Sequence, residues 1–335
     1  MTPPKTAAEL EGELPSLEAL EKVLWYDPLK LGHFHVRELA AVALFALTVG
    51  SILAAEAALL FGAPALSGLS LVPRLLVHAL CYSGLACVCY GVFVEPYRVV
   101  SRSVRVAHRK IKAPLRILHV GDLHVRHWSR VEEGVLAEAR KAAPDLIALT
   151  GDYSALPGSI YDLERLLREL VGVAPVYAAL GNSEYLRPVH QILRLPGLTW
   201  LDDDNRPVSV RGTPLRVYGI RPGSERNFWQ MGRNTRPFEF GVCLYHFPDF
   251  APQVERVPYD LMLSGHTHGG QIRLPGLGAL ISMSRAGTSF SEGVFSAEGR
   301  TAVVTRGVGC ESYGLPRARF LCPPEVVVID LVPPG

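Results

Sequence analysis

Two long apolar stretches near the start of the chain place the strongest constraint on its fold. Residues 38–62 (ELAAVALFALTVGSILAAEAALLFG) and 71–95 (LVPRLLVHALCYSGLACVCYGVFVE) are almost free of charge. Each holds roughly 20 mostly apolar residues, enough to cross a hydrocarbon core of about 30 Å as a helix. They also explain the positive mean hydropathy of +0.19. We therefore expect a two-helix transmembrane hairpin over 38–95; the alternative is a buried helical hairpin of a soluble protein.

Basic residues lie on the outer sides of both stretches, whereas the connection 63–70 carries no charge. Lys22, Lys30 and Arg37 precede the first stretch, and Arg98, Arg102, Arg105, Arg109, Lys110 and Lys112 follow the second. The positive-inside rule predicts that both flanks stay in the cytoplasm. Residues 1–37 contain no apolar run, so we expect a cytoplasmic segment and no cleavable signal peptide. Residues 96–112 are interpreted as a basic juxtamembrane linker beside anionic lipid.

Beyond this linker, short apolar runs alternate with helical patterns, which is typical of an α/β domain. Three runs end in glycine: LRILHVG (115–121), DLIALTG (145–151) and APVYAALG (174–181). Between them, residues 131–142 and 161–170 have apolar side chains at three- and four-residue steps, as in amphipathic helices. The second half is richer in strand patterns. We expect one globular α/β domain over 113–335.

Side chains that bind metals follow the strand-like runs at the points where they end. They are Asp122, His124, Asp152, Asn182, His246, His266 and His268. Loops at the carboxyl ends of strands are where α/β sheets place their ligands. Oxygen and imidazole ligands without thiolate suit first-row divalent ions such as Mn, Fe, Zn or Co. If one carboxylate bridges, the set can hold two ions about 3.5–4 Å apart, as in two-metal hydrolases.

Taken one at a time, these residues have simpler interpretations. Asp122 could cap a helix, the Gly-Asp and Gly-Asn pairs are commonly turns, and His246 could be a structural histidine. The segment GHTHGG (265–270) is more specific, since two histidines between glycines can present both rings to one point. The ordered set, with each member at a strand end, favours a metal centre.

In this order, the motifs resemble those of the calcineurin-like metallophosphoesterases: D-x-H, G-D, G-N-H-[DE], H and G-H-x-H. The continuations GHTHGGQIRLPGLGAL and YGLPRARFLCPPEVVVIDL are similar to the bacterial membrane-associated branch. The resemblance covers residues 113–332 and implies a four-layer α/β/β/α sandwich with two divalent ions, Mn before Fe, Zn or Co. It implies that the first ion is held by Asp122, His124 and His268, that Asp152 bridges, and that the second is held by Asn182, His246 and His266. Asp152, Asn182 and His246 are also the expected catalytic residues.

One position departs from the family pattern. The chain reads Gly181-Asn182-Ser183-Glu184, where the family usually has a histidine acting as general acid or phosphate ligand. Serine cannot protonate a leaving alkoxide near neutral pH. Either a neighbour such as Arg187, Tyr185 or His190 takes over, or the leaving group needs no proton. A phosphate or nucleotide is already a stable anion, so Ser183 favours a P–O–P bond as the substrate. Ser183 and Arg187 are expected to contact it.

Residues 221–240 (RPGSERNFWQMGRNTRPFEF) mix arginines with aromatic side chains and are expected to form a cap; a solvated loop is the alternative. Arg221 and Arg226 are candidate phosphate contacts, because guanidinium groups suit phosphate. A membrane-bound member with such a cap resembles the UDP-2,3-diacylglucosamine pyrophosphatases of lipid A synthesis. The resemblance implies cleavage of a lipid-linked pyrophosphate to UMP and a lipid phosphate, at the cytoplasmic side of the bacterial inner membrane, with membrane lipid as a partner.

Two other functions remain open. The chain could be a general metallophosphodiesterase or phosphatase acting on envelope or nucleotide substrates, or a catalytically inactive membrane scaffold, which the complete ligand set argues against. The net charge of only +2, together with the membrane tether, disfavours nucleic-acid binding. No protein partner is expected. The six cysteines form no CxxC pair, which fits reduced thiols.

Overall fold

The computed structural model describes residues 43, 46–61, 70–155, 159–224, 236–249, 259–282, 284, 287–311 and 317–335. The chain forms two compact units, Met1–Val77 and His78–Gly335. The predicted N-terminal segment 1–37 lies outside the described residues.

One helix in the described part of the chain is long and apolar enough to cross a membrane. This helix is α4 (Leu71–Phe93), followed by the 3₁₀ turn η2 (Glu95–Tyr97). Its apolar side chains are largely exposed, as in Leu80, which is 72% exposed. The preceding apolar helix, Ala46–Leu60, is shorter; at 1.5 Å per residue it extends roughly 22 Å, less than a hydrocarbon core. The predicted two-helix hairpin is therefore not confirmed, and residues 38–42, where its first span would begin, are not described.

The first of two six-stranded sheets has the strand order β1-β14-β2-β3-β4-β5. Its strands are β1 (Val100–Ala107), β2 (Leu115–Val120), β3 (Leu146–Leu149), β4 (Val176–Ala179), β5 (Leu198–Leu201) and β14 (Glu325–Val332). Strands β2 to β5 are parallel, whereas β14 runs antiparallel to β2 and parallel to β1. The parallel strands therefore end at one edge of the sheet, where the predicted ligands follow them.

Strand β1 lies in the segment that the sequence assigned to a basic linker. The strand pattern is the alternation of buried and exposed side chains, in which Val104 and Val106 are buried and Arg105 between them is exposed. The exposed arginines make this alternation difficult to recognise in the sequence. The strand pairs in parallel with β14 over its whole length. Residues 100–107 are thus an edge strand of the globular unit.

The second sheet has the strand order β12-β13-β9-β8-β7-β6. Its strands are β6 (Asp204–Val210), β7 (Thr213–Ile220), β8 (Phe240–Tyr245), β9 (Leu261–Ser264), β12 (Gly293–Ala297) and β13 (Arg300–Val304). Strands β7, β8, β9 and β13 are parallel, and β6 and β12 pair antiparallel at the two edges. A small hairpin, β10 (Arg273–Leu274) and β11 (Gly278–Ala279), follows the GHTHGG segment.

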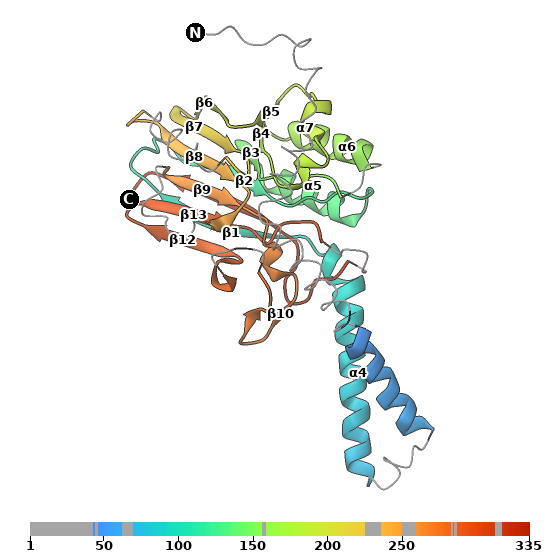
Figure 1. Ribbon diagram of the computed structural model, residues 1–335. Helices are drawn as coiled ribbons and strands as arrows, with labels where there is room; N and C mark the ends of the chain where they lie inside the picture. Colours follow the sequence, from blue (N-terminus) through green and yellow to red (C-terminus); the bar gives the residue numbers. More distant parts are fainter. Residues whose placement is uncertain are drawn as a thin grey trace. The chain divides into compact units, whose positions relative to one another are not determined.

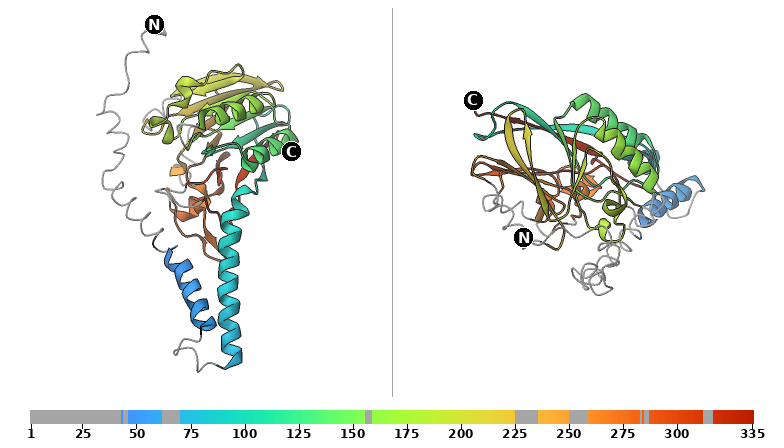
Figure 2. Two further views of the ribbon diagram at one scale, coloured as in Figure 1. Left: turned by 90° about the vertical axis from the view of Figure 1, so that its right-hand side faces the viewer. Right: turned by 90° about the horizontal axis from the view of Figure 1, so that it is seen from above.

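Helices α5 (Arg130–Ala142) and α6 (Ile160–Val171) cover one face of the first sheet, as Figures 1 and 2 show. Helix α5 begins with a capping box in which Ser129 and Glu132 satisfy each other's backbone N–H groups. Its apolar side chains, Val135 among them, pack against the sheet. The opposite face of the first sheet packs against the second sheet through a shared apolar core, which includes Ile117, Leu244 and Val327. Short helical segments complete the described elements: η4 (Ser183–Tyr185), α7 (Val189–Ile192), η6 (His268–Gly270) and η7 (Thr288–Phe290).

The mixed α/β fold with two sheets agrees with the sequence prediction. Three layers of the predicted four-layer sandwich are described, namely the helices and the two sheets. On the outer face of the second sheet, Tyr218, Tyr245 and Tyr259 form a further buried cluster. The described residues place no α-helix there; residues 225–235 and 250–258, which join strands of this sheet, lie outside them. Most of the predicted cap at 221–240 is therefore not described.

Candidate metal centre

The predicted metal ligands come together at the carboxyl ends of the central strands of both sheets. Asp122 and His124 follow β2, Asp152 follows β3, Asn182 follows β4, His246 follows β8, and His266 and His268 follow β9. Ligand atoms of Asp122, His124 and His268 lie within 4.8 Å of one another, and so do those of Asp122, Asp152 and His246. The remaining two residues join through Nε2 of His246, which lies 2.9 Å from Asn182 Oδ1 and 3.2 Å from His266 Nδ1.

The backbone at this edge is held in an uncommon conformation. Positive φ angles occur at Asp122 (51°), His124 (40°), Asp152 (57°), His266 (71°) and His268 (51°). Such angles crowd the Cβ atom in residues other than glycine and persist only where the surroundings enforce them. Neighbouring loops do so here, because the N–H of Asp122 donates to Gly151 O and the N–H of His124 donates to Asp152 O. The strain marks these loops as a functional region.

The hydrogen bonds of His246 direct a lone pair into the cluster. Nδ1 lies 2.8 Å from the carbonyl oxygen of Thr150, which can only accept, so Nδ1 carries the proton and Nε2 is left as an acceptor. Nε2 faces Asn182 Oδ1, a second acceptor, at 2.9 Å. Burial lowers the pKa of His246, but Asp152 and Asp122 more than offset it and raise the pKa overall. The position therefore attracts positive charge, which a cation bound between the two acceptors would supply.

A second group of ligand atoms comes together around His124. Its Nε2 lies 3.2 Å from Nε2 of His268 and 3.4 Å from Oδ2 of Asp152. Burial lowers the pKa of His124 to about 4 and that of His268 well below its usual value, so both rings are neutral near pH 7. Neutral imidazoles are the form that binds metals.

The two carboxylates differ in their electrostatic surroundings. Burial raises the pKa of Asp122 to about 7, with Asp152 adding to the effect and His246 opposing it. Burial also acts to raise the pKa of Asp152, but His246, His124 and the donors of Ser183 outweigh it and lower the pKa. Asp152 thus stays ionised between the two groups of ligands. Buried carboxylates and neutral imidazoles facing one another are a donor set that fits two first-row divalent ions.

Asp152 is held in place by the segment 181–184. Ser183 donates to Asp152 Oδ1 through both its hydroxyl (2.7 Å) and its N–H (2.9 Å). Glu184 accepts the N–H groups of Asp152 (2.9 Å), Tyr153 (3.0 Å) and Gly181 (2.7 Å). A Cβ atom on Gly181 would lie 2.3 Å from Asp152 Oδ1, so only glycine fits. The side chain of Ser183 therefore supports the proposed bridging carboxylate, and the segment as a whole orients it.

The predicted substrate contacts have different surroundings. Arg187 is half-buried and close enough to His124 to act on its pKa. Arg221 forms an ion pair with Asp202 and lies over the ring of Tyr185, with its guanidinium carbon 5.8 Å from the ring centroid. Arg226 lies outside the described residues. Of the three arginines, Arg187 thus lies near the predicted ligand His124, whereas Arg221 is paired with Asp202.

Sequence reasoning missed Glu311. Its carboxylate lies within 4.8 Å of ligand atoms of His124 and Asp152, where it could share a cation with them. Its backbone is held by Gln271, whose side chain accepts the N–H of Glu311 (2.8 Å) and donates to its carbonyl oxygen (2.9 Å). The available signal was weak, because Glu311 follows a glycine-rich loop and not an apolar run.

Two further arginines also went unassigned, although both belong to the quoted segment YGLPRARFLC. Arg317 donates to the carbonyl oxygen of His124 at 3.4 Å, and Arg319 lies 3.4 Å from Nδ1 of His268. Both side chains are buried. Guanidinium groups so close to His124 and His268 add positive charge to the candidate site, which favours an anion there.

Comparisons with known proteins agree with this arrangement. Residues 115–270 match the family model described as calcineurin-like phosphoesterase. The protein named phosphodiesterase YaeI of Escherichia coli (strain K12) is 31% identical over 245 residues, covering 66% of this chain and 83% of that protein. Proteins named UDP-2,3-diacylglucosamine pyrophosphatase LpxG from Chlamydia muridarum and Chlamydia trachomatis are 36% and 28% identical, each over 64% of this chain and 83% of the relative.

These matches confirm two of the sequence predictions. The first is the family, and the second is the class of enzyme, a metal-dependent hydrolase of phosphoric esters or anhydrides. The matched residues 115–270 include every predicted ligand, from Asp122 to His268. This chain therefore belongs to the calcineurin-like phosphoesterase family.

Proposed function

We propose that this protein is a membrane-anchored hydrolase with two divalent metal ions that cleaves the pyrophosphate of a nucleotide-linked lipid. UDP-2,3-diacylglucosamine is the substrate we favour, with UMP and a lipid phosphate as products. The observation that carries the metal-dependent chemistry is the convergence of two carboxylates and four buried or half-buried imidazoles on one cluster. Manganese is the ion we expect, ahead of iron, zinc or cobalt.

The residues divide between two ion positions. Asp122, His124 and His268 would hold the first ion, Asn182, His246 and His266 the second, and Asp152 would bridge. Bound there, the ions would neutralise phosphoryl oxygens and lower the pKa of a water toward about 7. Ser183 and Glu184 keep the Asp152 carboxylate in one orientation, which sets the spacing between the two positions.

Ser183 supports a pyrophosphate as the bond that is cleaved. Its hydroxyl donates to Asp152 at 2.7 Å, so its proton is engaged by the proposed bridging ligand. The family usually has a histidine at this position, which can donate a proton to an alkoxide leaving group. Ser183 cannot take over that proton transfer. A nucleotide or lipid phosphate leaves as a stable anion and does not need that proton.

Arg187 and Arg317 support a substrate with more than one phosphate. Each has a buried Nε atom that meets no hydrogen-bond acceptor among the described residues. Both lower the pKa of His124 electrostatically, which places their charges near the metal ligands. Buried guanidinium donors without acceptors favour an oxyanion as their partner. The second phosphate of a pyrophosphate would supply it.

Helix α4 supports action on a lipid. It is long and apolar enough to cross a bilayer, and its apolar surface is exposed. The basic residues that follow it favour a catalytic unit on the cytoplasmic face of the inner membrane. The two chlamydial relatives named as UDP-2,3-diacylglucosamine pyrophosphatases add the specific substrate.

The test is to incubate the purified protein with Mn²⁺ and detergent micelles containing UDP-2,3-diacylglucosamine, and to measure UMP. The Asp152→Asn variant, prepared in parallel, controls for a contaminating hydrolase. We expect UMP release that depends on both the metal and Asp152. No UMP from a protein that binds Mn²⁺ would reject the lipid substrate.

A general phosphodiesterase is the second candidate, and the relative named phosphodiesterase YaeI favours it. Such an enzyme would hydrolyse bis(p-nitrophenyl) phosphate efficiently and would gain nothing from micelles. The ratio of the two activities therefore distinguishes the candidates. A protein that binds no Mn, Fe or Zn would be a membrane scaffold instead.

A further inference from the structure

The end of helix α4 packs closely against residues 319–322 of the globular unit. The carbonyl oxygen of Gly91 accepts the N–H of Arg319 at 2.9 Å. The ring of Tyr90 meets that of Phe320 edge-on, with centroids 6.4 Å apart. A Cβ atom on Gly91 would lie 3.1 Å from the carbonyl oxygen of Arg319, so the absence of a side chain permits this approach.

Glu95, which follows the helix, holds residues 319–322 through hydrogen bonds to its carboxylate. Its side chain is 1% exposed, and its two carboxylate oxygens accept the N–H groups of Leu321 and Cys322. Hydrogen bonds to an ionised acceptor are about twice as strong as neutral ones. A buried carboxylate also tolerates little displacement of its donors, because it has no water to replace them. Glu95 therefore sets the path of the backbone at Leu321 and Cys322.

This segment in turn contacts the GHTHGG loop. The thiol of Cys322 donates to the carbonyl oxygen of His268 at 3.3 Å. The N–H of Phe320 donates to Gln271 O, and the N–H of Arg273 donates to Phe320 O, both at 2.9 Å. The backbone at His268 and in the residues that follow it is thus tied to residues that Glu95 and α4 hold.

Arg319 extends the same support to Asp122. Its side chain is fully buried, and Nη2 donates to the carbonyl oxygens of Gly307 (3.2 Å) and Gly309 (2.6 Å). The N–H of Gly309 donates to Asp122 O at 2.6 Å. A Cβ atom on Gly307 would lie 2.5 Å from Asp122 Oδ2, which shows how tightly this loop packs against the carboxylate. Arg319 therefore lies beside His268 and, through Gly307 and Gly309, also supports Asp122.

We infer that Glu95 is a positioning residue of the metal centre, which acts through residues 319–322 on the placement of His268 and Asp122. The inference rests on the proposed two-metal function. It makes the end of helix α4 a part of the catalytic unit, whereas the sequence suggested a transmembrane hairpin followed by a basic linker. A change at the base of the helix should therefore alter metal binding.

A purely structural role is the alternative, and Glu132 provides the matched control. Glu132 is also 1% exposed, and its carboxylate accepts the N–H of Ser129 at 2.8 Å in the capping box of α5. Replacing either glutamate by alanine removes a buried carboxylate from backbone donors. Of the two glutamates, only Glu95 binds backbone donors in a segment that itself contacts a proposed metal ligand, His268.

The experiment compares Glu95→Ala, Glu95→Gln and Glu132→Ala in the full-length protein in detergent micelles. Mn²⁺ affinity is measured by isothermal titration calorimetry, and Tm is measured on the metal-free proteins. We expect Glu95→Ala to weaken Mn²⁺ binding about tenfold, a typical effect of removing support behind a metal ligand. Glu95→Gln, which keeps one acceptor oxygen, should restore part of the affinity. Glu132→Ala should lower Tm and leave the Kd for Mn²⁺ within twofold of the wild type.

Equal Mn²⁺ affinity in wild type and Glu95→Ala would overturn the inference while leaving the proposed function intact. If Glu95→Ala is not recovered folded, Glu95→Gln decides, and an unchanged Kd in that variant overturns the inference as well. A wild-type protein that binds no Mn²⁺ would reject the two-metal function itself, and the positioning role with it.

Discussion

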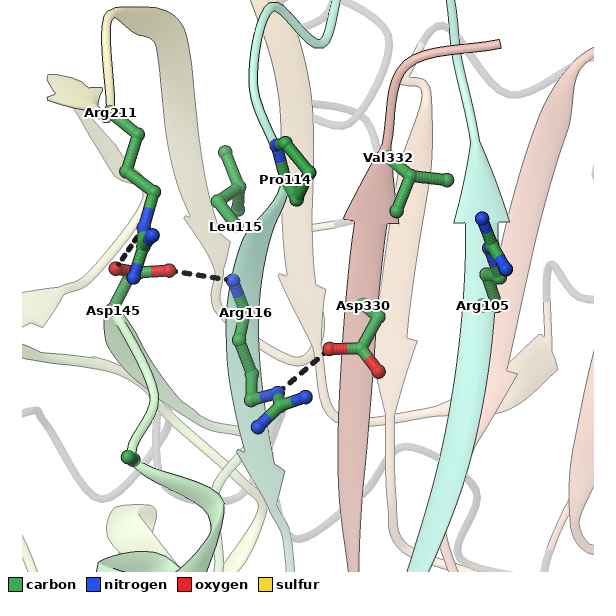
Figure 3. Close-up of a pocket in the computed structure, with 9 residues that line it drawn as sticks. Arg105, Pro114, Leu115, Arg116, Asp145, Arg211, Asp330 and Val332 are labelled. Carbon is green, nitrogen blue, oxygen red and sulfur yellow. Dashed lines mark hydrogen bonds and ion pairs between the residues drawn. The ribbon is translucent and has the colours of Figure 1, made fainter. Parts of the chain in front are cut away.

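The two ends of the first sheet both carry acidic and basic side chains, but they are built in opposite ways. At the carboxyl ends of β2 and β3, Asp122 and Asp152 are buried, have positive φ angles and face imidazoles. At the opposite end, Figure 3 shows Asp145 beside Arg211 and Asp330 beside Arg116 in an open pocket. Both of these ion pairs have N–O distances of 2.7 Å.

The difference favours the buried cluster as the site of chemistry. In the pocket of Figure 3, each acid has a fixed arginine partner, and the arginine side chains are 41% and 59% exposed. Such pairs contribute about 0–1 kcal/mol and need no ligand. At the metal-centre end, lone pairs of His124, His246 and His268 converge with the carboxylates, which is a donor set that fits a cation. Perturbed pKa values accumulate at that end, as is common at functional sites.

The largest effect should come from removing the proposed bridge. Asp152→Asn keeps the volume and the hydrogen-bond acceptor for Ser183, so the fold should survive. Loss of the bridging charge should lower hydrolysis roughly 1,000-fold or more. The measurement is turnover at saturating Mn²⁺, with circular dichroism to verify the fold. The matched variant Asp330→Asn, at the opposite end, should retain activity within twofold; comparable losses in the two variants would abolish the distinction between the ends.

Glu311→Gln tests whether the metal-centre end extends beyond the predicted ligands. The carboxylate of Glu311 lies near His124 and Asp152, so its neutral replacement should weaken Mn²⁺ binding by up to about tenfold. Calorimetric titration of the purified variant measures this. Gln271, which holds the Glu311 backbone, remains in place, so local structure should persist. An unaltered affinity would remove Glu311 from the set of ligand candidates.

The pH dependence of stability offers a test at His119, which is buried beside Thr150 beneath the metal centre. Burial, and to a smaller extent Arg102, lowers its pKa from 6.5 to about 3. Between these values the unfolded chain binds a proton that the folded chain does not. The free energy of unfolding should therefore fall as the pH falls below 6.5, by about 1–2 kcal/mol between pH 7 and pH 5.

Urea unfolding of the metal-free protein at both pH values measures this loss. The His119→Gln variant has no imidazole at this position. Its free energy of unfolding should therefore fall between pH 7 and pH 5 by about 1–2 kcal/mol less than that of the wild type. Identical losses in variant and wild type would show that His119 is not held neutral in the folded state.

Ser183→His restores the residue that the family usually has. It should raise phosphomonoester hydrolysis relative to pyrophosphate cleavage about threefold or more, because only the ester needs a proton on its leaving group. Rates on an alkyl phosphomonoester such as glycerol 3-phosphate, whose alkoxide leaving group needs a proton, and on the pyrophosphate substrate give the ratio. The loss of the hydroxyl donor to Asp152 should affect both reactions alike, so it cancels in this ratio. A ratio equal to that of the wild type would contradict the leaving-group argument.

The smallest effect should follow Arg211→Ala in the pocket of Figure 3. The pair that Arg211 forms with Asp145 is exposed on the arginine side, so the free energy of unfolding should fall by less than about 1 kcal/mol. Chemical denaturation measures the change, and turnover should equal that of the wild type. A large loss of activity would show that this end also takes part in function.

Much of the candidate metal centre, as a cluster of side chains, was predictable because its signal is local. Asp122, Asp152 and His246 each follow an apolar run, and parallel strands end at a common edge, so residue type and position in the run sufficed. The convergence of the seven side chains follows the prediction, although the roles of the individual residues still await the experiments above. The fold class was predictable for the same reason, since periodicity distinguishes strands from helices.

Other features were decided only by tertiary structure. Strand β1 was hidden because its exposed arginines resemble a linker, and its pairing with β14 joins residues more than two hundred positions apart. Glu95, Arg319 and Glu311 have no local pattern that marks them, because their contacts come from distant segments. Local periodicity and motif spacing describe what one segment can do, whereas the support behind a metal ligand depends on which segments meet in the folded chain.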